Sequence, residues 1–252
     1  MKIKEIGLAM GLLLGFATVS QAATVFIDDF NRTGPLHGSI TSTGGLTWVS
    51  STNNSTVTTN GGQTGGWNAK VGFTPVTGEL YLLTLTTTET IGNALEFGFG
   101  IHSGGFGQWD GLIQNVSNMQ TARINADPTW NTYGSTVGGT RTHTQYTLDA
   151  GTGPGFVNTL TLLLDTTSGL STSQLTYAIN GVDKGTWVAD VTGYNSVLFG
   201  RGHYGGDGSP QLNDPTFSGT VSSFQLEIIP EPSIALLGGF GMLCLLGRRR
   251  RA

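Results

Sequence analysis

The chain has 252 residues, of which 40 are glycine, 9% are aromatic and 11% are charged. This composition excludes a disordered polyelectrolyte, and it favours short strands and turns over helices. Residues 23–229 carry six Lys or Arg against fourteen Asp or Glu. Their net charge of −8 excludes a nucleic-acid partner, because the phosphate backbone would be repelled.

The first 22 residues have the pattern of a secretory signal peptide. Lys2 and Lys4 supply the positive start, residues 6–19 are mostly apolar, and Ser20-Gln21-Ala22 forms a small-x-small cleavage site. No polar face interrupts the apolar stretch, which argues against a buried N-terminal helix. We therefore expect residues 1–22 to be removed before Ala23 and the following domain to be exported.

Between residues 23 and 229 the apolar residues recur with period two, as they do in half-buried β-strands. Asn180-Gly181 lies between two such runs and predicts a tight type I′ hairpin, because both residue types tolerate positive φ. The alternating sets are Leu95, Phe97, Phe99 and Ile101; Leu160, Leu162 and Leu164; Leu175, Tyr177 and Ile179; and Phe224, Leu226 and Ile228. Further strands are predicted at 24–30, 46–50, 70–73, 80–88, 112–116, 141–148 and 196–199.

About a dozen strands with one apolar face predict an all-β fold, a two-sheet antiparallel β-sandwich of the jelly-roll type. No internal repeat or charged linker divides residues 23–229, so we expect one domain there. The only cysteine, Cys244, lies beyond this domain, which therefore has no disulfide. Long exposed loops are expected at residues 51–68, 127–139 and 202–215.

Two stretches of this domain resemble the concanavalin A-like, or laminin G-like, jelly roll. They are TVFIDDFNRTG at residues 24–34, and NTLTLLLDTTSG with LTYAINGVDKGT at residues 158–169 and 175–186. A first-strand Asp-Asp-Phe and a strand–Asp-Thr–hairpin unit are common in that superfamily. The resemblance covers residues 23–229 and implies the fold, with a bias towards glycan binding.

Familiar catalytic motifs are missing from the sequence. It has no G-x-S-x-G and no H-x-x-x-H pair. It also lacks E-x-D-x-E, the motif by which glycosidases of concanavalin-like folds resemble one another and which sets two carboxylates in one cleft. Glu96 alone is placed on a strand where a cleft carboxylate could stand, and we expect it to be solvated. We therefore predict a non-enzymatic structural or glycan-associating module. The alternative is a glycan-acting hydrolase or lyase with an unrecognised active site.

Exposed aromatic side chains are the groups on which a sugar ring stacks. Aromatics in predicted loops are therefore candidate ligand-binding residues, whereas Trp48 and Trp187 are expected in the core. The candidates are Trp67, Trp109, Trp130 and Tyr133. No cofactor is expected, although hard oxygen ligands are available for a structural calcium ion. The candidate calcium ligands are Asp28, Asp29, Asp207 and Asp214, which equally suit turns and Asx caps.

Residues 230–252 form a distinct C-terminal tail. Its fifteen uncharged, mostly apolar residues, 233–247, would span about 22 Å as a helix, short of the ~30 Å hydrocarbon core. The basic residues that follow are expected to hold the C-terminal end of this short transmembrane helix in the cytoplasm. They are Arg248, Arg249, Arg250 and Arg251. Pro230-Glu231-Pro232 is expected to break the last strand and to leave extended backbone that a processing enzyme can grip.

The tail closely resembles the PEP-CTERM sorting signal of Gram-negative bacteria, which joins a Pro-Glu-Pro motif, a short transmembrane helix and an arginine cluster. In that family an exosortase, a membrane transpeptidase with a cysteine nucleophile, recognises the motif and removes the tail. The resemblance implies an exosortase substrate that is held transiently in the inner membrane and then sorted to the cell surface or extracellular matrix. Extracellular polysaccharide is then an expected partner. An ordinary short membrane anchor is the alternative.

Overall fold

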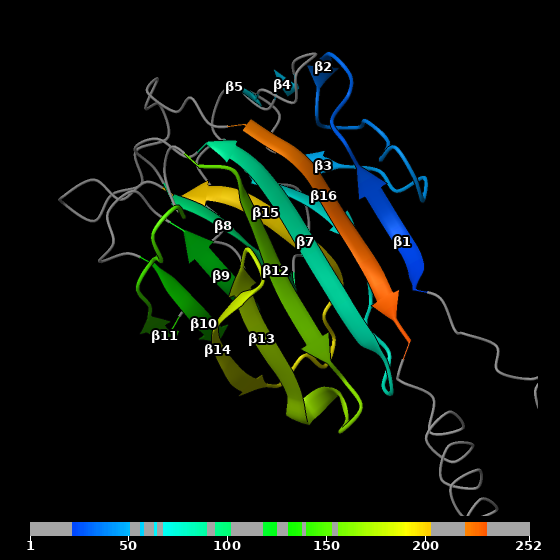
Figure 1. Ribbon diagram of the computed structural model, residues 1–252. Helices are drawn as coiled ribbons and strands as arrows, with labels where there is room; N and C mark the ends of the chain where they lie inside the picture. The colour runs from blue at the N-terminus through cyan, green and yellow to red at the C-terminus, as the bar shows by residue number, and fades with distance from the viewer. Residues whose placement is uncertain are drawn as a thin grey trace, which may run out of the picture. The chain divides into compact units, whose positions relative to one another are not determined.

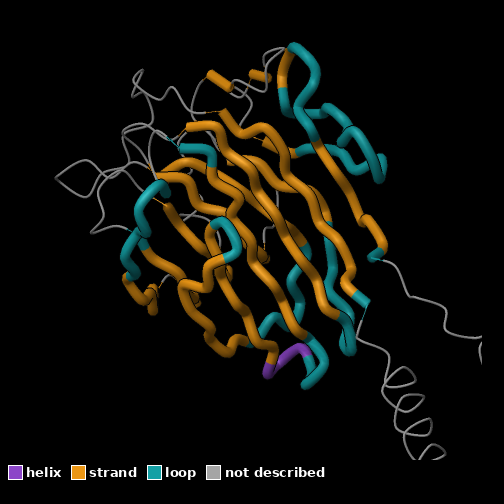
Figure 2. The backbone as a smooth tube through the Cα atoms, viewed as in Figure 1, coloured by secondary structure: helices purple, strands orange, loops and turns teal. Residues whose placement is uncertain are grey.

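Strands make up most of the part of the chain that the structure describes. The computed structural model describes residues 22–50, 56–57, 63–64, 68–89, 94–101, 118–124, 131–137, 140–152, 156–202 and 220–230. Within these ranges the only helical element is a single 3₁₀ turn at Leu170–Thr172. Residues Thr24–Ile228 form one compact unit. The tube in Figure 2 is accordingly strand with connecting loops almost throughout.

The larger strands form two antiparallel sheets. The six-stranded sheet has the order β1 (Ala23–Asp28), β16 (Thr220–Ile229), β7 (Leu80–Glu89), β12 (Asn158–Asp165), β13 (Ser173–Ile179) and β14 (Val182–Ala189). The seven-stranded sheet has the order β11 (Thr140–Gln145), β10 (Thr132–Val137), β9 (Asn118–Ile124), β8 (Ala94–Ile101), β15 (Ser196–Gly202), β6 (Asn68–Gly72) and β3 (Val49–Ser50). Three two-residue strands, β2 (Gly34–Pro35), β4 (Thr56–Val57) and β5 (Gln63–Thr64), make a small third sheet. Figure 1 shows β16, β7 and β12 in front of β8 and β15.

The core lies between the two large sheets, as the alternation of apolar residues predicts. On β12, Leu160, Leu162 and Leu164 are fully buried and alternate with half-buried residues. Phe97 and Phe99 of β8 are buried against them from the opposite sheet. Burial of each such side chain contributes roughly 1.5–3 kcal/mol to folding. The predicted all-β, two-sheet antiparallel sandwich is thus confirmed.

The hairpin between β13 and β14 also forms as the sequence predicts. Asn180 and Gly181 have φ values of 51° and 80°, the left-handed backbone that a type I′ turn requires at both central residues. The Asn180 side chain accepts a hydrogen bond from the Thr159 amide at 2.7 Å, which ties the turn to β12. Beyond the turn, the β13–β14 register shifts between Tyr177 and Ala178, and Lys184 is the extra residue of this bulge.

Two strands of the seven-stranded sheet differ from the sequence prediction. β9 was not predicted, and β10 lies inside residues 127–139, where a loop was expected. Strands β9 and β10 each carry polar residues on both faces, so they lack the alternation of apolar residues by which a strand is predicted. Gln120 of β9 points into the core, where it is 1% exposed. The predicted strand at 112–116 lies outside the described residues.

Gln120 is accommodated in the core because its side-chain amide is satisfied by three partners. Its Nε2 donates a hydrogen bond to the Tyr194 hydroxyl at 2.9 Å. Its Oε1 accepts hydrogen bonds from Ser135 Oγ at 2.5 Å and from Trp187 Nε1 at 2.8 Å. Since Trp187 belongs to β14 and Gln120 to β9, this buried network joins the two sheets.

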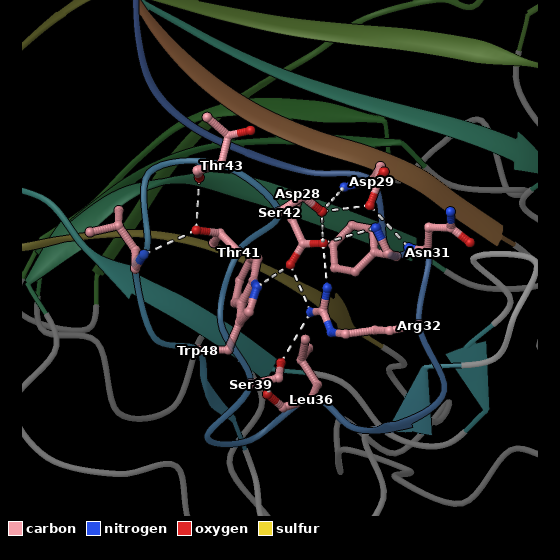
Figure 3. Close-up of polar contacts among 12 residues, drawn as sticks. Asp28, Asp29, Asn31, Arg32, Leu36, Ser39, Thr41, Ser42, Thr43 and Trp48 are labelled. Atoms are coloured by element: carbon pink, nitrogen blue, oxygen red, sulfur yellow. Dashed lines mark hydrogen bonds and ion pairs between the residues drawn. The ribbon is translucent and has the colours of Figure 1, made fainter.

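A second polar network fixes the first strand (Figure 3). The Asp28 carboxylate is fully buried, and Arg32 donates to both of its oxygens, at 2.6 and 2.7 Å. Trp48 Nε1 donates to Asp28 Oδ2, and the Phe30 amide donates to Oδ1 at 2.8 Å. A carboxylate removed from water is tolerated only when it is paired and hydrogen-bonded in this way. The Asp-Asp-Phe-Asn-Arg stretch is therefore a structural anchor.

We predict that Asp28→Asn lowers the free energy of unfolding by about 2–4 kcal/mol, because it leaves the guanidinium of Arg32 without its bidentate partner. Asp149→Asn is the matched control, since Asp149 also forms an ion pair, with Lys184, but its side chain is 49% exposed. The control is expected to lose less stability than Asp28→Asn, because the Asp149 carboxylate is half exposed to water whereas that of Asp28 is fully buried. Urea denaturation measures both, and equal losses in the two variants would contradict the structural role of Asp28.

Buried tyrosines make stability depend on pH at the alkaline end. Burial raises the pKa of Tyr194 to about 12, so this hydroxyl stays protonated in the folded protein when the unfolded chain has begun to lose its proton near pH 10. We predict that stability is unaffected by this group below pH 10 and falls between pH 10 and 12 by up to about 1.4 kcal/mol per pH unit. In urea denaturation Tyr194→Phe should flatten that slope. The control is the same comparison of wild-type protein and Tyr194→Phe at pH 8, where the Tyr194 hydroxyl is protonated in both the folded and the unfolded chain. An unchanged dependence of unfolding free energy on pH between 10 and 12 in the variant would show that Tyr194 is not the group responsible.

Candidate functional site

The outer face of the seven-stranded sheet, which points away from the core, carries the candidate site. Leu95, Phe97 and Phe99 point inward from β8, so Glu96 and Gly98 point to the outer face. On the neighbouring strand β9, Ala122 and Ile124 are core residues. Thr121 and Arg123 therefore share the outer face with Glu96, and we call these three residues the Glu96 cluster.

The Glu96 cluster is tightly packed. Glu96 is 0% exposed, Thr121 1% and Arg123 3%. Thr121 Oγ1 donates a hydrogen bond to Glu96 Oε1 at 2.6 Å. Arg123 is the direct ladder partner of Glu96, a register that sets Cβ atoms about 4.5–5.5 Å apart. The expectation of a solvated Glu96 is therefore wrong, because alternation places the side chain on the outer face but does not say whether that face is open to water.

The strands on either side of the cluster add small and basic groups to the same face. On β15, Gly200 is the direct partner of Glu96, so no side chain stands beside the carboxylate there. Lys70 of β6 is half-buried on this face, and desolvation lowers its pKa. On the other side, His143 of β11 is half-buried, with its Nδ1 3.4 Å from Thr132 Oγ1. The site thus combines one carboxylate with an arginine, a lysine and a histidine.

Glycoside hydrolysis uses a pair of carboxylates about 5–10 Å apart. In the described strands of the seven-stranded sheet Glu96 is the one Asp or Glu, so these strands alone do not supply the pair. The described residues also contain no group of three or more His, Cys, Asp or Glu that could hold a metal ion. Sequence reasoning weighed Glu96 but missed Arg123 and Thr121, because β9 lacked an apolar pattern by which to place them.

The aspartates predicted as calcium ligands on the first strand are engaged by protein donors. Asp28 accepts from the cationic Arg32 and from three further donors, including Ser42 Oγ at 3.4 Å, an arrangement that does not suit a calcium ion. Asp29 accepts hydrogen bonds from Ser42 and the Asn31 amide, which lower its pKa. Asp207 and Asp214 lie outside the described residues, where a calcium site stays a prediction.

Of the aromatic residues predicted to bind a ligand, the structure describes only Tyr133. It lies on β10 rather than in a loop, half-buried and stacked on Trp187 with ring centroids 5.2 Å apart. Its position requires a glycine at residue 185, since an added Cβ there would lie 2.0 Å from the Tyr133 hydroxyl. Trp48 is fully buried and Trp187 packs against the core, as expected. Trp67, Trp109 and Trp130 lie outside the described residues, and their ligand role stays a prediction.

The sorting tail is described only at its first residue. β16 ends at Ile229, directly before Pro230, as expected for a proline that cannot continue the strand. Glu231, Pro232 and Arg248 to Arg251 lie outside the described residues. Within the part of the chain that is described, no helix has the length and apolar character needed to cross a membrane.

Comparison with known proteins relates this chain to others by structure. No protein-family profile matches the sequence, and no curated protein matches it. The endo-1,3-β-glucanase from Streptomyces sioyaensis has a TM-score of 0.55 and 13% identity, over 85% of this chain and 99% of that one. The endo-β-1,3-glucanase from Pyrococcus furiosus has a TM-score of 0.54 and 10% identity, over 85% and 97%. Peanut lectin with a nine-residue peptide is a weaker match, with a TM-score of 0.45 and 12% identity, over 84% and 100%.

These comparisons correct the prediction that the chain is not an enzyme. That prediction rested on the lack of a familiar catalytic motif, yet the two glucanases, whose TM-scores exceed 0.5, are both enzymes. Identities of 10–13% relate the folds rather than the activities. The described domain therefore shares the two-sheet antiparallel sandwich fold of these two glucanases.

Proposed function

We propose that the chain is a glycan-degrading enzyme, a hydrolase or lyase, whose substrate lies across the outer face of the seven-stranded sheet. The observation that carries the proposal is the position of Glu96, a buried carboxylate with its own hydrogen-bond donor and an arginine directly opposite. Endo-1,3-β-glucanases with the same fold support the class of substrate, a polysaccharide.

Glu96 is suited to proton transfer because its environment fixes one geometry. The hydrogen bond from Thr121 Oγ1 to Oε1 holds the carboxyl group in one orientation. Glu96 would donate a proton to the departing glycosidic oxygen or accept one from the sugar ring.

The residues next to Glu96 differ in size on its two sides. Gly98 follows Glu96 on the same face, and Gly200 lies directly beside it on β15. Because glycines add no side chain there, we propose that a sugar ring reaches the carboxyl group from that side. Arg123 and Thr121 flank the opposite side of Glu96 and limit the approach to that direction.

We predict that the full-length protein, purified in mild detergent, cleaves at least one polysaccharide in a panel of neutral and acidic glycans. Glu96→Gln should lower the rate by about 100-fold or more, because it removes the proton-transfer group but keeps its size. Reducing-end assays detect either reaction, and the absorbance of unsaturated sugars detects elimination alone.

Glu227→Gln is the matched control, since Glu227 lies on β16 of the other sheet and is not fully buried. It should leave the rate unchanged. No product from any polysaccharide, or equal rates for Glu96→Gln and the wild-type protein, would reject the enzymatic proposal.

We also propose that the protein is exported and sorted by an exosortase-type enzyme. The support lies in the sequence: a signal-peptide pattern at residues 1–22, and a Pro-Glu-Pro motif, apolar segment and arginine cluster at residues 230–252. The short apolar segment would hold the motif at the inner membrane while the tail is removed. The released domain would then act at the cell surface or in the extracellular matrix, on extracellular polysaccharide.

We predict that protein recovered from the surface of its native host begins near Ala23 and lacks residues 233–252. Intact-mass measurement tests this directly. Replacing Pro230, Glu231 and Pro232 with alanine should leave a full-length form in the inner membrane. Neutral residues at 248–251 should instead let the tail cross the membrane and leave the protein unsorted. Surface protein that retains residues 233–252 would identify the tail as a plain anchor.

A further inference from the structure

The few cations of the domain are unevenly distributed between its two sheets. Residues 23–229 contain six Lys or Arg in all: Arg32, Lys70, Arg123, Arg141, Lys184 and Arg201. Four of the six belong to strands of the seven-stranded sheet, which hold one carboxylate, Glu96. Strands of the six-stranded sheet hold Lys184 alone against five carboxylates: Asp28, Glu89, Asp165, Asp183 and Glu227. The strands of the two sheets therefore have net charges of +3 and −4, within a domain of net charge −8.

The two cations outside the seven-stranded sheet are neutralised by ion pairs. Arg32 binds both oxygens of Asp28, and Lys184 pairs with Asp149. These pairs leave little positive field on the rest of the domain, since opposite charges in contact cancel at longer range. Of the Lys and Arg residues in the described strands, all but Lys184 thus belong to the sheet that carries the Glu96 cluster.

At least two of these cations lie on the outer face. Lys70 lies between the core residues Ala69 and Val71, and Arg123 lies between the core residues Ala122 and Ile124, so alternation turns both away from the core. Strand order β9-β8-β15-β6 sets them three strands apart, about 14 Å at the usual spacing. Arg123 is 3% exposed and lies opposite Glu96, so the half-buried Lys70 is the cation of this pair that a ligand can reach.

We propose that the glycan bound at this face is an anionic polysaccharide of the polyuronate type, a substrate class that rests on the function proposed above. A uronate carboxylate would meet Lys70, the half-buried cation of this face, while the scissile bond lies at Glu96. The rest of the domain is negatively charged and repels polyanions, so a polyuronate chain would bind only at this sheet. Desolvation lowers the pKa of Lys70, and an anionic ligand would offset that cost of keeping the ammonium charged.

Affinity electrophoresis of the full-length protein tests the proposal with polygalacturonate and its methyl ester, two polymers that share a backbone but differ in charge. The protein should bind polygalacturonate more tightly, and added salt should weaken that binding. Lys70→Gln should reduce the affinity for polygalacturonate about five-fold, a typical effect for one partly exposed charge pair. Lys184→Gln, which removes a cation from the other sheet, is the matched control and should leave the affinity unchanged.

Each remaining outcome overturns the proposal in a recognisable way. Equal or tighter binding of the methyl ester or of neutral β-1,3-glucan would reject the anionic substrate but leave a glycan-acting enzyme standing. Equal losses in the Lys70 and Lys184 variants would reject the outer face as the binding surface for the anion. Binding and cleavage of neither charged nor neutral polysaccharide would reject the proposed function together with its substrate class.

Discussion

The buried carboxylate of Asp28 is the contact through which both sheets of the domain are positioned. It holds Arg32 and the Trp48 indole by direct hydrogen bonds, and Arg32 in turn reaches Ser39 Oγ at 3.0 Å. The indole so fixed packs edge-on against Phe199 of β15 and in a tilted arrangement against Phe224 of β16, with ring centroids 5.3 and 6.0 Å apart. Because β15 and β16 belong to different sheets, one polar anchor orients the aromatic contact that joins them.

Sequence alone predicted the parts of the fold in which burial follows a simple rule. Strand β12 shows its period in Leu160, Leu162 and Leu164, and the β13–β14 turn shows its geometry in Asn180-Gly181. Strands β9 and β10 could not be predicted in the same way. Gln120 occupies a core position only because Tyr194, Ser135 and Trp187, distant in sequence, supply its partners. A search for alternating apolar residues cannot detect a polar side chain that is buried because its hydrogen bonds are satisfied.

The same limit explains what could be predicted of the candidate site. The sequence correctly placed Glu96 on a strand, with its side chain on the face opposite Phe97 and Phe99. It could not predict that Glu96 is buried, because burial depends on residues from other strands. Arg123 and Thr121 come to it through the pairing of β8 with β9, a contact between segments more than 20 residues apart. Asp28 was singled out as suiting either a calcium ion or a turn, because a ligand carboxylate and an anchoring carboxylate look identical until the position of Arg32 is known.

The bulge at Lys184 bears on how such domains behave at high local concentration. β14 is the outermost strand of the six-stranded sheet, and a regular outermost strand offers a continuous row of backbone donors and acceptors to any second strand that approaches. Lys184 interrupts the register there and places a charged residue at the interruption. When many copies are crowded on a surface or in a gel, the β14 edge of one molecule would therefore pair poorly with a strand of another. The irregularity would favour separate, soluble sandwiches over sheets that extend from one molecule into the next.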